Sequence, residues 1–147
     1  MVVAIKSGGR DIAEADANAC VFGYAVGLDM TRRDVQGEAK KLGRPWDMGK
    51  GFDNSAPCAP IHRVEDTGII ENATIWLDVN GKRRQESNVT HLIWSIPETI
   101  AYLSALVELK PGDLIYSGTP DGVAAVGTGD TLHGHVDGLT DLTITYA

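Results

Sequence analysis

The sequence predicts an α+β fold with mixed or antiparallel sheets, and three observations support this class. Short apolar or alternating segments recur along most of the 147 residues. Only a few segments show the 3.6-residue periodicity of a helix. Turn residues separate the segments, and the pair Asn80-Gly81 between two of them is typical of a type I′ hairpin.

The chain begins with the apolar segment Met1–Ile5, which we predict to be a strand ending at the turn Ser7-Gly8-Gly9. These first residues resemble the interior of a strand, so we expect the chain to be truncated at its N-terminus. A short helix is expected over Ile12–Cys20, with Asp11 as its N-cap and Glu14 at position N3.

A buried strand is expected over Phe22–Met30. Thr31 and Asp34 have the spacing of a capping box and predict that a second helix begins there. That helix should end at Gly43-Arg44-Pro45, and the long segment Asp47–Pro60 is predicted to be a functional loop.

The second half of the chain begins with a possible short strand over Ile61–Val64. Thr74–Val79 alternates apolar and polar residues and should pair with Lys82–Gln85 across the Asn80-Gly81 turn. Arg83 and Arg84 in the return strand are expected to be solvated. Ser95–Glu108 has the strongest helical pattern of the chain, and Ser95 with Glu98 predicts a capping box.

After this helix, Pro111-Gly112 should turn into a strand over Asp113–Tyr116. The glycine-rich loop Ser117–Val123 follows. Two final strands are expected over Thr131–Val136 and Thr140–Tyr146. His133 and His135 alternate on the first of these strands and are predicted to face solvent, because no third residue stands at a spacing suited to a metal.

The composition is that of a single globular domain, residues 1–147, with 43 % hydrophobic and 22 % charged residues. A net charge of −7 without a compensating basic block argues against nucleic acid or an anionic membrane as a partner. No segment reaches the ~20 apolar residues of a membrane span. The two cysteines, Cys20 and Cys58, form no recognisable framework, which agrees with a reducing, cytoplasmic location.

Asp29 is the most informative single residue, because it stands at the end of the apolar segment that precedes the second helix. An ionised carboxylate at such a position costs several kcal/mol, on the order of 3–5, unless a positive group meets it. A divalent cation, Arg32 or Arg33, and Lys50 are the candidates. We interpret Asp29 as one ligand of a divalent-metal site that handles an anionic substrate.

Four segments, in this order along the chain, resemble the fumarylacetoacetate hydrolase family. They are Gly23–Gln36, Gly49-Lys50-Gly51-Phe52-Asp53, the Val79-Asn80-Gly81 hairpin with Gln85, and Leu109–Asp113 leading into Ser117–Val123. Within the family, the chain is most similar to small bacterial acylpyruvate hydrolases. The resemblance implies the mixed β-sheet roll of the family's C-terminal domain, with a few helices.

The resemblance also implies an activity. Family members use Mg²⁺ or Mn²⁺ to hydrolyse a carbon–carbon bond in a 1,3-diketo acid, a small anionic substrate, and the pyruvate part leaves as an enolate. Negative charge must be stabilised as it develops, and hard oxygen ligands suit such a cation. The resemblance further implies a homodimer.

The functional residues carried over from the family are Asp29 as a metal ligand, Lys50 and Gln36 as catalytic residues, and Thr119, Gly118 and Arg33 as substrate-binding residues. Asp34 is expected to cap a helix rather than to bind the metal.

The family's other metal ligands, a Glu-x-Glu pair, and its water-activating His and Glu would precede Met1 in this numbering. Two alternatives therefore stay open at this stage. The chain could be a non-catalytic remnant with the same fold, or it could act as an oxaloacetate decarboxylase or isomerase, because these reactions share the metal and the enolate.

Overall fold

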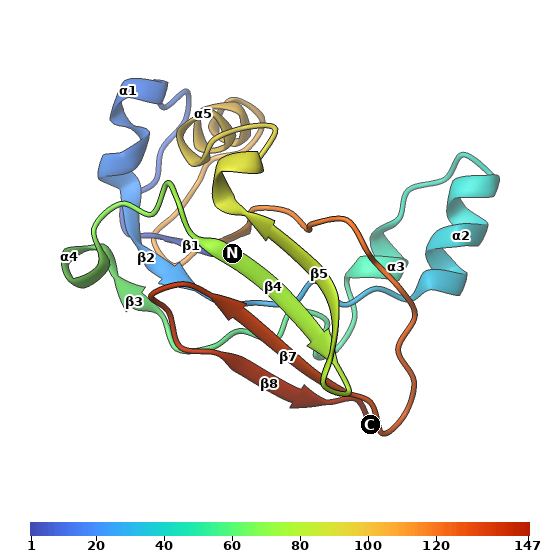
Figure 1. The fold of residues 1–147 in the computed structure, drawn as a ribbon. Helices are drawn as coiled ribbons and strands as arrows, with labels where there is room; N and C mark the ends of the chain where they lie inside the picture. The colour runs from blue at the N-terminus through green and yellow to red at the C-terminus, as the bar shows by residue number, and fades with distance from the viewer.

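The computed structural model describes residues 1–147 and contains two four-stranded sheets with short helices around them (Figure 1). The first sheet has the order β3-β2-β1-β6, with β1 at Val2–Ile5, β2 at Val21–Ala25, β3 at His62–Arg63 and β6 at Leu114–Tyr116. The second has the order β5-β4-β7-β8, with β4 at Thr74–Val79, β5 at Lys82–Asn88, β7 at Thr131–Val136 and β8 at Leu142–Thr145. All neighbouring strands are antiparallel, which confirms the α+β class and decides between mixed and antiparallel pairing.

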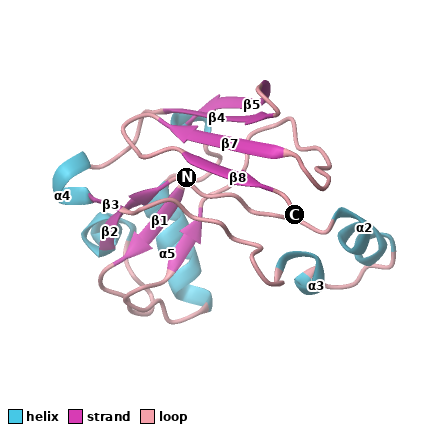
Figure 2. Ribbon diagram, turned by 90° about the horizontal axis from the view of Figure 1, so that it is seen from below, coloured by secondary structure: helices cyan, strands magenta, loops and turns pink.

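The two sheets form separate layers, and the helices lie around them (Figure 2). The helices are α1 (Glu14–Ala17), α2 (Arg33–Lys41), α3 (Asp47–Lys50), α4 (Val64–Thr67) and α5 (Ile96–Leu106), with 3₁₀ turns at Asn18–Cys20 and Val89–His91. Helix α5 packs with α1 against the first sheet, whereas α2 and α3 lie together beside the sheets. None of these helices combines the length and the apolar character that a membrane crossing requires.

The hydrophobic core is centred on β1, whose four residues Val2–Ile5 are all buried. β-Branched residues suit a strand that is covered on both faces. Val21 and Tyr24 of β2 and Ile100 of α5 are fully buried in the same core. The core therefore fixes the first sheet, from which the segment bearing Asp29 continues.

Two local predictions are confirmed in detail. Asn80 and Gly81 both have positive φ angles, 52° and 72°, as a type I′ turn requires, and they connect β4 to β5. At the start of α5, Ser95 Oγ accepts a hydrogen bond from the Glu98 backbone N–H, and the Glu98 carboxylate accepts one from the Ser95 N–H at 2.7 Å. Both groups of this capping box are therefore satisfied.

The two other predicted caps are wrong. Helix α1 begins at Glu14 with Ala13 at its N-cap position, while Asp11 lies outside it with φ 51°. Helix α2 begins at Arg33, and Thr31 does not cap it because the Thr31 hydroxyl donates to the backbone carbonyl of Asp29. At Thr31 the short polar side chain bonds the loop before the helix, a competing interaction that the spacing alone does not exclude.

Several predicted boundaries also shift. The strand predicted over Phe22–Met30 ends at Ala25, and the return strand predicted over Lys82–Gln85 continues to Asn88. The segment Asp47–Pro60 is not loop throughout, because α3 occupies its first four residues. The predicted strand Ile61–Val64 is reduced to two residues, after which α4 begins.

Candidate active site

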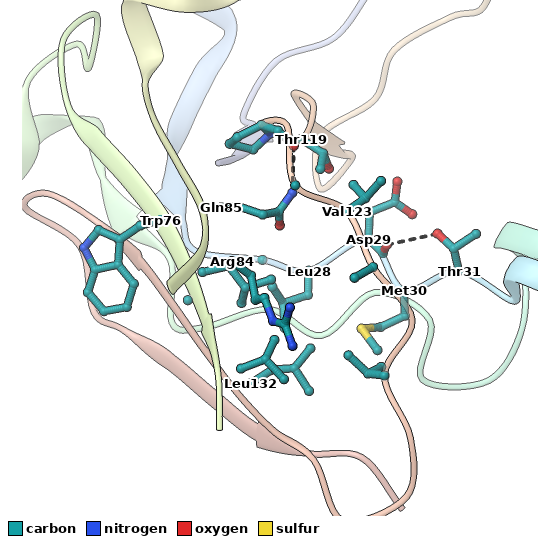
Figure 3. A pocket seen from close by; sticks show the side chains of 18 of the residues that line it. Leu28, Asp29, Met30, Thr31, Trp76, Arg84, Gln85, Thr119, Val123 and Leu132 are labelled. Atoms are coloured by element: carbon teal, nitrogen blue, oxygen red, sulfur yellow. Dashed lines mark hydrogen bonds between the residues drawn. The ribbon is translucent and has the colours of Figure 1, made fainter. Parts of the chain in front are cut away.

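A cavity of about 750 Å³ lies beside the second sheet and is lined by several segments of the chain (Figure 3). They include the segment 26–34 after β2, Lys50 at the end of α3, strands β4, β5 and β7, and the loop 118–126. The volume is in the range of small-molecule sites. Five of the six residues predicted for the site line this cavity: Asp29, Lys50, Arg33, Gly118 and Thr119.

Asp29 reaches the cavity from an extended segment rather than from a strand end. After β2, the chain runs alongside residues 55–59, and backbone hydrogen bonds of 3.0 and 2.9 Å join Leu28 to Pro57 and Met30 to Ser55. These bonds satisfy the backbone of the segment without a sheet neighbour. Asp29 therefore lies four residues beyond the end of β2, in a position fixed by the loop opposite.

Lys50 is the positive partner of Asp29. The Lys50 ammonium donates to Asp29 Oδ2 at 2.6 Å and to the Thr31 hydroxyl at 3.0 Å. Helix α3 sets this position, and the Arg32 N–H donates to the Gly49 carbonyl at 3.0 Å beside it. The side chains of Lys50 and Asp29 remain 35 % and 43 % exposed, so both groups are accessible from the cavity.

The two arginines considered as partners of Asp29 are engaged elsewhere. The Arg32 guanidinium lies over the Phe52 ring, 4.4 Å from its centroid, and Arg33 Nη1 donates to Gln36 Oε1 at 3.3 Å. Gln36 does not line the cavity. Its predicted role would therefore be exerted through Arg33 in this arrangement.

The loop that carries Gly118 and Thr119 is held at Ser117 and at Pro120. Ser117 donates to the Met1 carbonyl through its N–H at 3.1 Å and through its hydroxyl at 2.9 Å. The buried Gln85 side chain on β5 donates to the Pro120 carbonyl at 2.7 Å. Thr119 is thereby placed beside Gln85 of β5 and on the same cavity as Asp29 (Figure 3).

Sequence reasoning did not find every residue of this cavity. Arg84 is exposed, as expected for it and for Arg83, and it also lines the cavity, as do Leu28, Met30, Val123 and Leu132. Arg83 does not line the cavity and pairs with Asp78 and Glu86. The sequence pattern does not show which of the two arginines faces the cavity, because this depends on the pairing of β5 with β4.

Tyr116, on the last strand of the first sheet, lies near this site without offering a base. Burial is the main cause that raises the pKa of its hydroxyl to about 12, and the neighbouring Cys58 and the charge of Asp29 act in the same direction. The hydroxyl therefore remains protonated and donates to the Ala56 carbonyl at 2.8 Å.

A second group of titratable side chains lies on β7. His133 and His135 both bond the carboxylate of Asp141, at 2.8 and 2.6 Å, and His135 also bonds Asp137 at 3.0 Å. Burial opposes the charged form of His135, but these carboxylates outweigh it and raise its pKa. Hydrogen bonds from Thr74 and then from His135 lower the pKa of Asp137 to about 2. The imidazoles are thus tied to aspartates.

The donor set around Asp29 bears on which metal it could bind. Carboxylate oxygen is the donor that Mg²⁺ and Mn²⁺ prefer, and Mg²⁺ is commonly held by one or two carboxylates together with water and substrate oxygens. The 147 residues contain no group of three or more His, Cys, Asp or Glu side chains arranged around a metal position. Asp29 therefore fits such a cation as a single protein ligand, and these residues do not complete the coordination shell.

The fold and this cavity define a class of protein. The C-terminal domain profile of the fumarylacetoacetate hydrolase family matches residues 1–146, and the chain belongs to this family. Among curated proteins, the chain is 46 % identical over 145 residues to the fumarylpyruvate hydrolase of a Ralstonia species, covering 99 % of this chain and 75 % of the relative. It is 44 % identical over 130 residues to an oxaloacetate tautomerase of Escherichia coli, covering 88 % of this chain and 59 % of the relative.

A solved structure shows the same fold. The crystal structure of fumarylpyruvate hydrolase from Pseudomonas aeruginosa in complex with Mn²⁺ and pyruvate matches with a TM-score of 0.96 and 49 % identity. The match covers 98 % of this chain and 62 % of the Pseudomonas chain. Our chain thus spans about three fifths of the length of this relative and of the Escherichia coli protein.

Proposed function

We propose that this protein is a metal-dependent hydrolase that cleaves a carbon–carbon bond in acylpyruvates such as fumarylpyruvate. Water adds to the acyl carbonyl, the bond to the pyruvate part breaks, and the products are pyruvate and a carboxylic acid. The observation that supports this proposal most strongly is that Asp29, Lys50 and Thr119 line one cavity. The cavity thus combines a ligand for a cation with groups that can bind an anion. The identity of 46 % to a fumarylpyruvate hydrolase supports it.

Asp29 would hold Mg²⁺ or Mn²⁺ through its carboxylate. The relative solved with Mn²⁺ and pyruvate supports this choice of cation. When bound, the cation would stabilise the negative charge that develops on the enolate oxygen of the leaving pyruvate. The exposure of the Asp29 side chain, 43 %, leaves room for water and substrate oxygens beside it.

Lys50 would neutralise the carboxylate or enolate charge of the bound substrate, because its side chain is partly exposed beside Asp29. The Thr119 hydroxyl and the backbone around Gly118 would bind the acid end of the substrate. The Arg33 guanidinium would assist from the start of α2, and Gln36 would orient Arg33 by accepting its hydrogen bond. Each of these residues would therefore bind a negatively charged group of the substrate or orient a residue that does.

We further propose that residues 1–147 form the catalytic domain and that the protein is a cytoplasmic homodimer acting in the catabolism of aromatic compounds. The two relatives that are fumarylpyruvate hydrolases support this role. Sedimentation of the purified protein tests the dimer, and a single species at the monomer mass would contradict it.

The test of the activity is the loss of the enol absorbance of fumarylpyruvate, measured with Mg²⁺ or Mn²⁺ and after chelation of the metal. We expect Asp29→Asn to lower kcat/KM by about a hundredfold or more, because it removes a charge needed in the transition state. Asp16→Asn is the matched control, since Asp16 is an exposed residue on α1 that does not line the cavity. Turnover that survives both chelation and Asp29→Asn would refute the proposal.

A second candidate is the keto–enol tautomerisation of oxaloacetate, favoured by the 44 % identity to an oxaloacetate tautomerase. Both reactions pass through an enolate beside a carboxylate, so the same cavity serves either. Comparing kcat/KM for fumarylpyruvate with that for oxaloacetate separates the two candidates. Turnover of either substrate would eliminate the non-catalytic alternative.

A further inference from the structure

Arg84 occupies an irregular position in the second sheet. Between β4 and β5, Leu77 pairs with Gln85 and the next residue, Asp78, pairs with Arg83, so Arg84 has no partner in the register. Such a β-bulge inserts one extra residue and changes the direction of its side chain, and bulges of this kind are frequent next to active sites. Arg84 is thus the extra residue of the bulge, whereas Arg83 keeps Asp78 as its partner.

The two arginines have different environments. Arg83 lies over the Trp76 ring, 4.2 Å from its centroid, and pairs with the carboxylates of Asp78 and Glu86. Arg84 makes no ion pair and no side-chain hydrogen bond in the structure, and it lines the same cavity as Asp29 (Figure 3). Its guanidinium is therefore the unpaired cation on the β5 side of the cavity.

The surroundings of Arg84 favour an anionic ligand. Arg84 is exposed on the cavity that Leu28, Met30, Val123 and Leu132 also line, so its guanidinium is accessible to a carboxylate there. Asp130 is a nearby acid whose charge attracts Arg84, but it forms no ion pair with Arg84, and its carboxylate accepts hydrogen bonds from Gly127 N and Asn80 Nδ2, at 2.8 and 2.7 Å.

The loop opposite holds Arg84 at a fixed place relative to Thr119. Gly122 passes so close to β5 that a Cβ atom there would lie 2.1 Å from the Arg84 carbonyl oxygen, and its φ of +98° is one that glycine adopts readily. Two residues before Gly122, the Pro120 carbonyl accepts the hydrogen bond of Gln85. The backbone bearing Arg84 and the loop bearing Thr119 are thus packed as one unit.

We propose that Arg84 binds the terminal carboxylate of the acyl chain, so that the cavity selects acylpyruvates whose acyl part is itself an acid over those with a neutral acyl chain. This inference rests on the proposed function, which places the oxo acid end at Asp29, Lys50 and Thr119. Arg84 is the specificity residue for the other end of the substrate. A planar guanidinium can bind a carboxylate with two parallel hydrogen bonds.

Calorimetric titration in the presence of Mn²⁺ tests this with two probes, 2-oxoadipate and 2-oxohexanoate, which differ only in a terminal carboxylate. The wild type should bind 2-oxoadipate more tightly. Arg84→Gln should weaken 2-oxoadipate binding by about tenfold, a change of about 1.4 kcal/mol, and leave 2-oxohexanoate unchanged. Arg83→Gln is the matched control and should alter neither affinity, and Arg84→Lys should restore part of the preference.

The possible failures are distinguishable. Equal loss for both acids, no loss for either, or the same loss in Arg83→Gln would overturn the role of Arg84 while leaving the proposed function intact. Absence of binding of either acid to the wild type would overturn both proposals. Thermal unfolding of each variant, with a melting temperature near that of the wild type, shows that the comparison is made on folded protein.

Discussion

Replacing Lys50 by methionine separates a functional role from a structural one. The Lys50–Asp29 pair is short, 2.6 Å, but its two side chains are 35 % and 43 % exposed. Ion pairs with this exposure contribute about 0–1 kcal/mol to stability. For a chain of this size, about 1 kcal/mol corresponds to about 2–4 °C in melting temperature, which calorimetry or circular dichroism resolves. We therefore expect Lys50→Met to unfold at most slightly below the wild type.

The same substitution should improve metal binding. The Lys50 ammonium and a divalent cation would both use the carboxylate of Asp29, so they repel one another. Two unit charges about 4 Å apart in water repel by about 1 kcal/mol, and the cation carries twice that charge. We expect Mn²⁺ to bind Lys50→Met roughly fivefold to thirtyfold more tightly, measured by the paramagnetic resonance signal of free Mn²⁺. At the same time kcat/KM should fall by about a hundredfold.

The control is Lys41→Met, because Lys41 is an exposed lysine at the end of α2 that makes no ion pair and does not line the cavity. Its melting temperature, Mn²⁺ affinity and activity should equal those of the wild type. A melting temperature of Lys50→Met that is lower than that of the wild type by about 10 °C or more would show that Lys50 supports the fold and would refute our reasoning. A Mn²⁺ affinity of Lys50→Met as low as that of Asp29→Asn would also refute it.

Three further outcomes are expected. Ser95→Ala removes the N-cap of α5 and should cost about 1 kcal/mol, or about 2–4 °C in a thermal unfolding scan. Gln85→Leu leaves the Pro120 carbonyl without its donor and should cost about 1–3 kcal/mol in urea unfolding, with faster proteolysis of the loop. The raised pKa of His135 means that its charged form stabilises the fold below pH 6.5 and that this contribution is lost as the pH rises through the folded-state pKa. His135→Gln should remove this decline from melting temperatures measured between about pH 5 and pH 8.5, a range that spans the ordinary pKa of histidine.

Features set by neighbouring residues in the chain were predictable. The Asn80-Gly81 turn and the capping box of α5 depend on backbone and side-chain groups within four residues of one another, so the sequence pattern contains all the information they need. The apolar segment Val2–Ile5 was predictable for a related reason, since a strand buried on both faces needs only a run of apolar residues.

Features set by distant residues were not predictable in the same way. Phe22–Met30 continues the apolar pattern past Ala25, but the sheet neighbour ends there and residues 55–59 replace it. Thr31 had the spacing of a helix cap, yet its hydroxyl bonds the Asp29 carbonyl and Lys50, nineteen positions away. The site residues themselves came from a resemblance between motifs, and the structure adds which of them share a cavity.

Arg84 shows why the composition of a pocket depends on strand register. Simple alternation along β5 places Arg83 and Arg84 on opposite faces but does not say which face is which, and it makes both look like solvated residues near a hairpin. The register resolves this, because the bulge keeps Arg83 opposite Asp78 and leaves Arg84 unpaired. A one-residue change in pairing transfers a side chain from one face to the other.

If the bulge does define substrate choice, deletion of Arg84 should restore regular pairing, leave the Arg83–Asp78 pair intact and abolish the preference for 2-oxoadipate. A deletion variant that folds and keeps that preference would show that another group binds the terminal carboxylate.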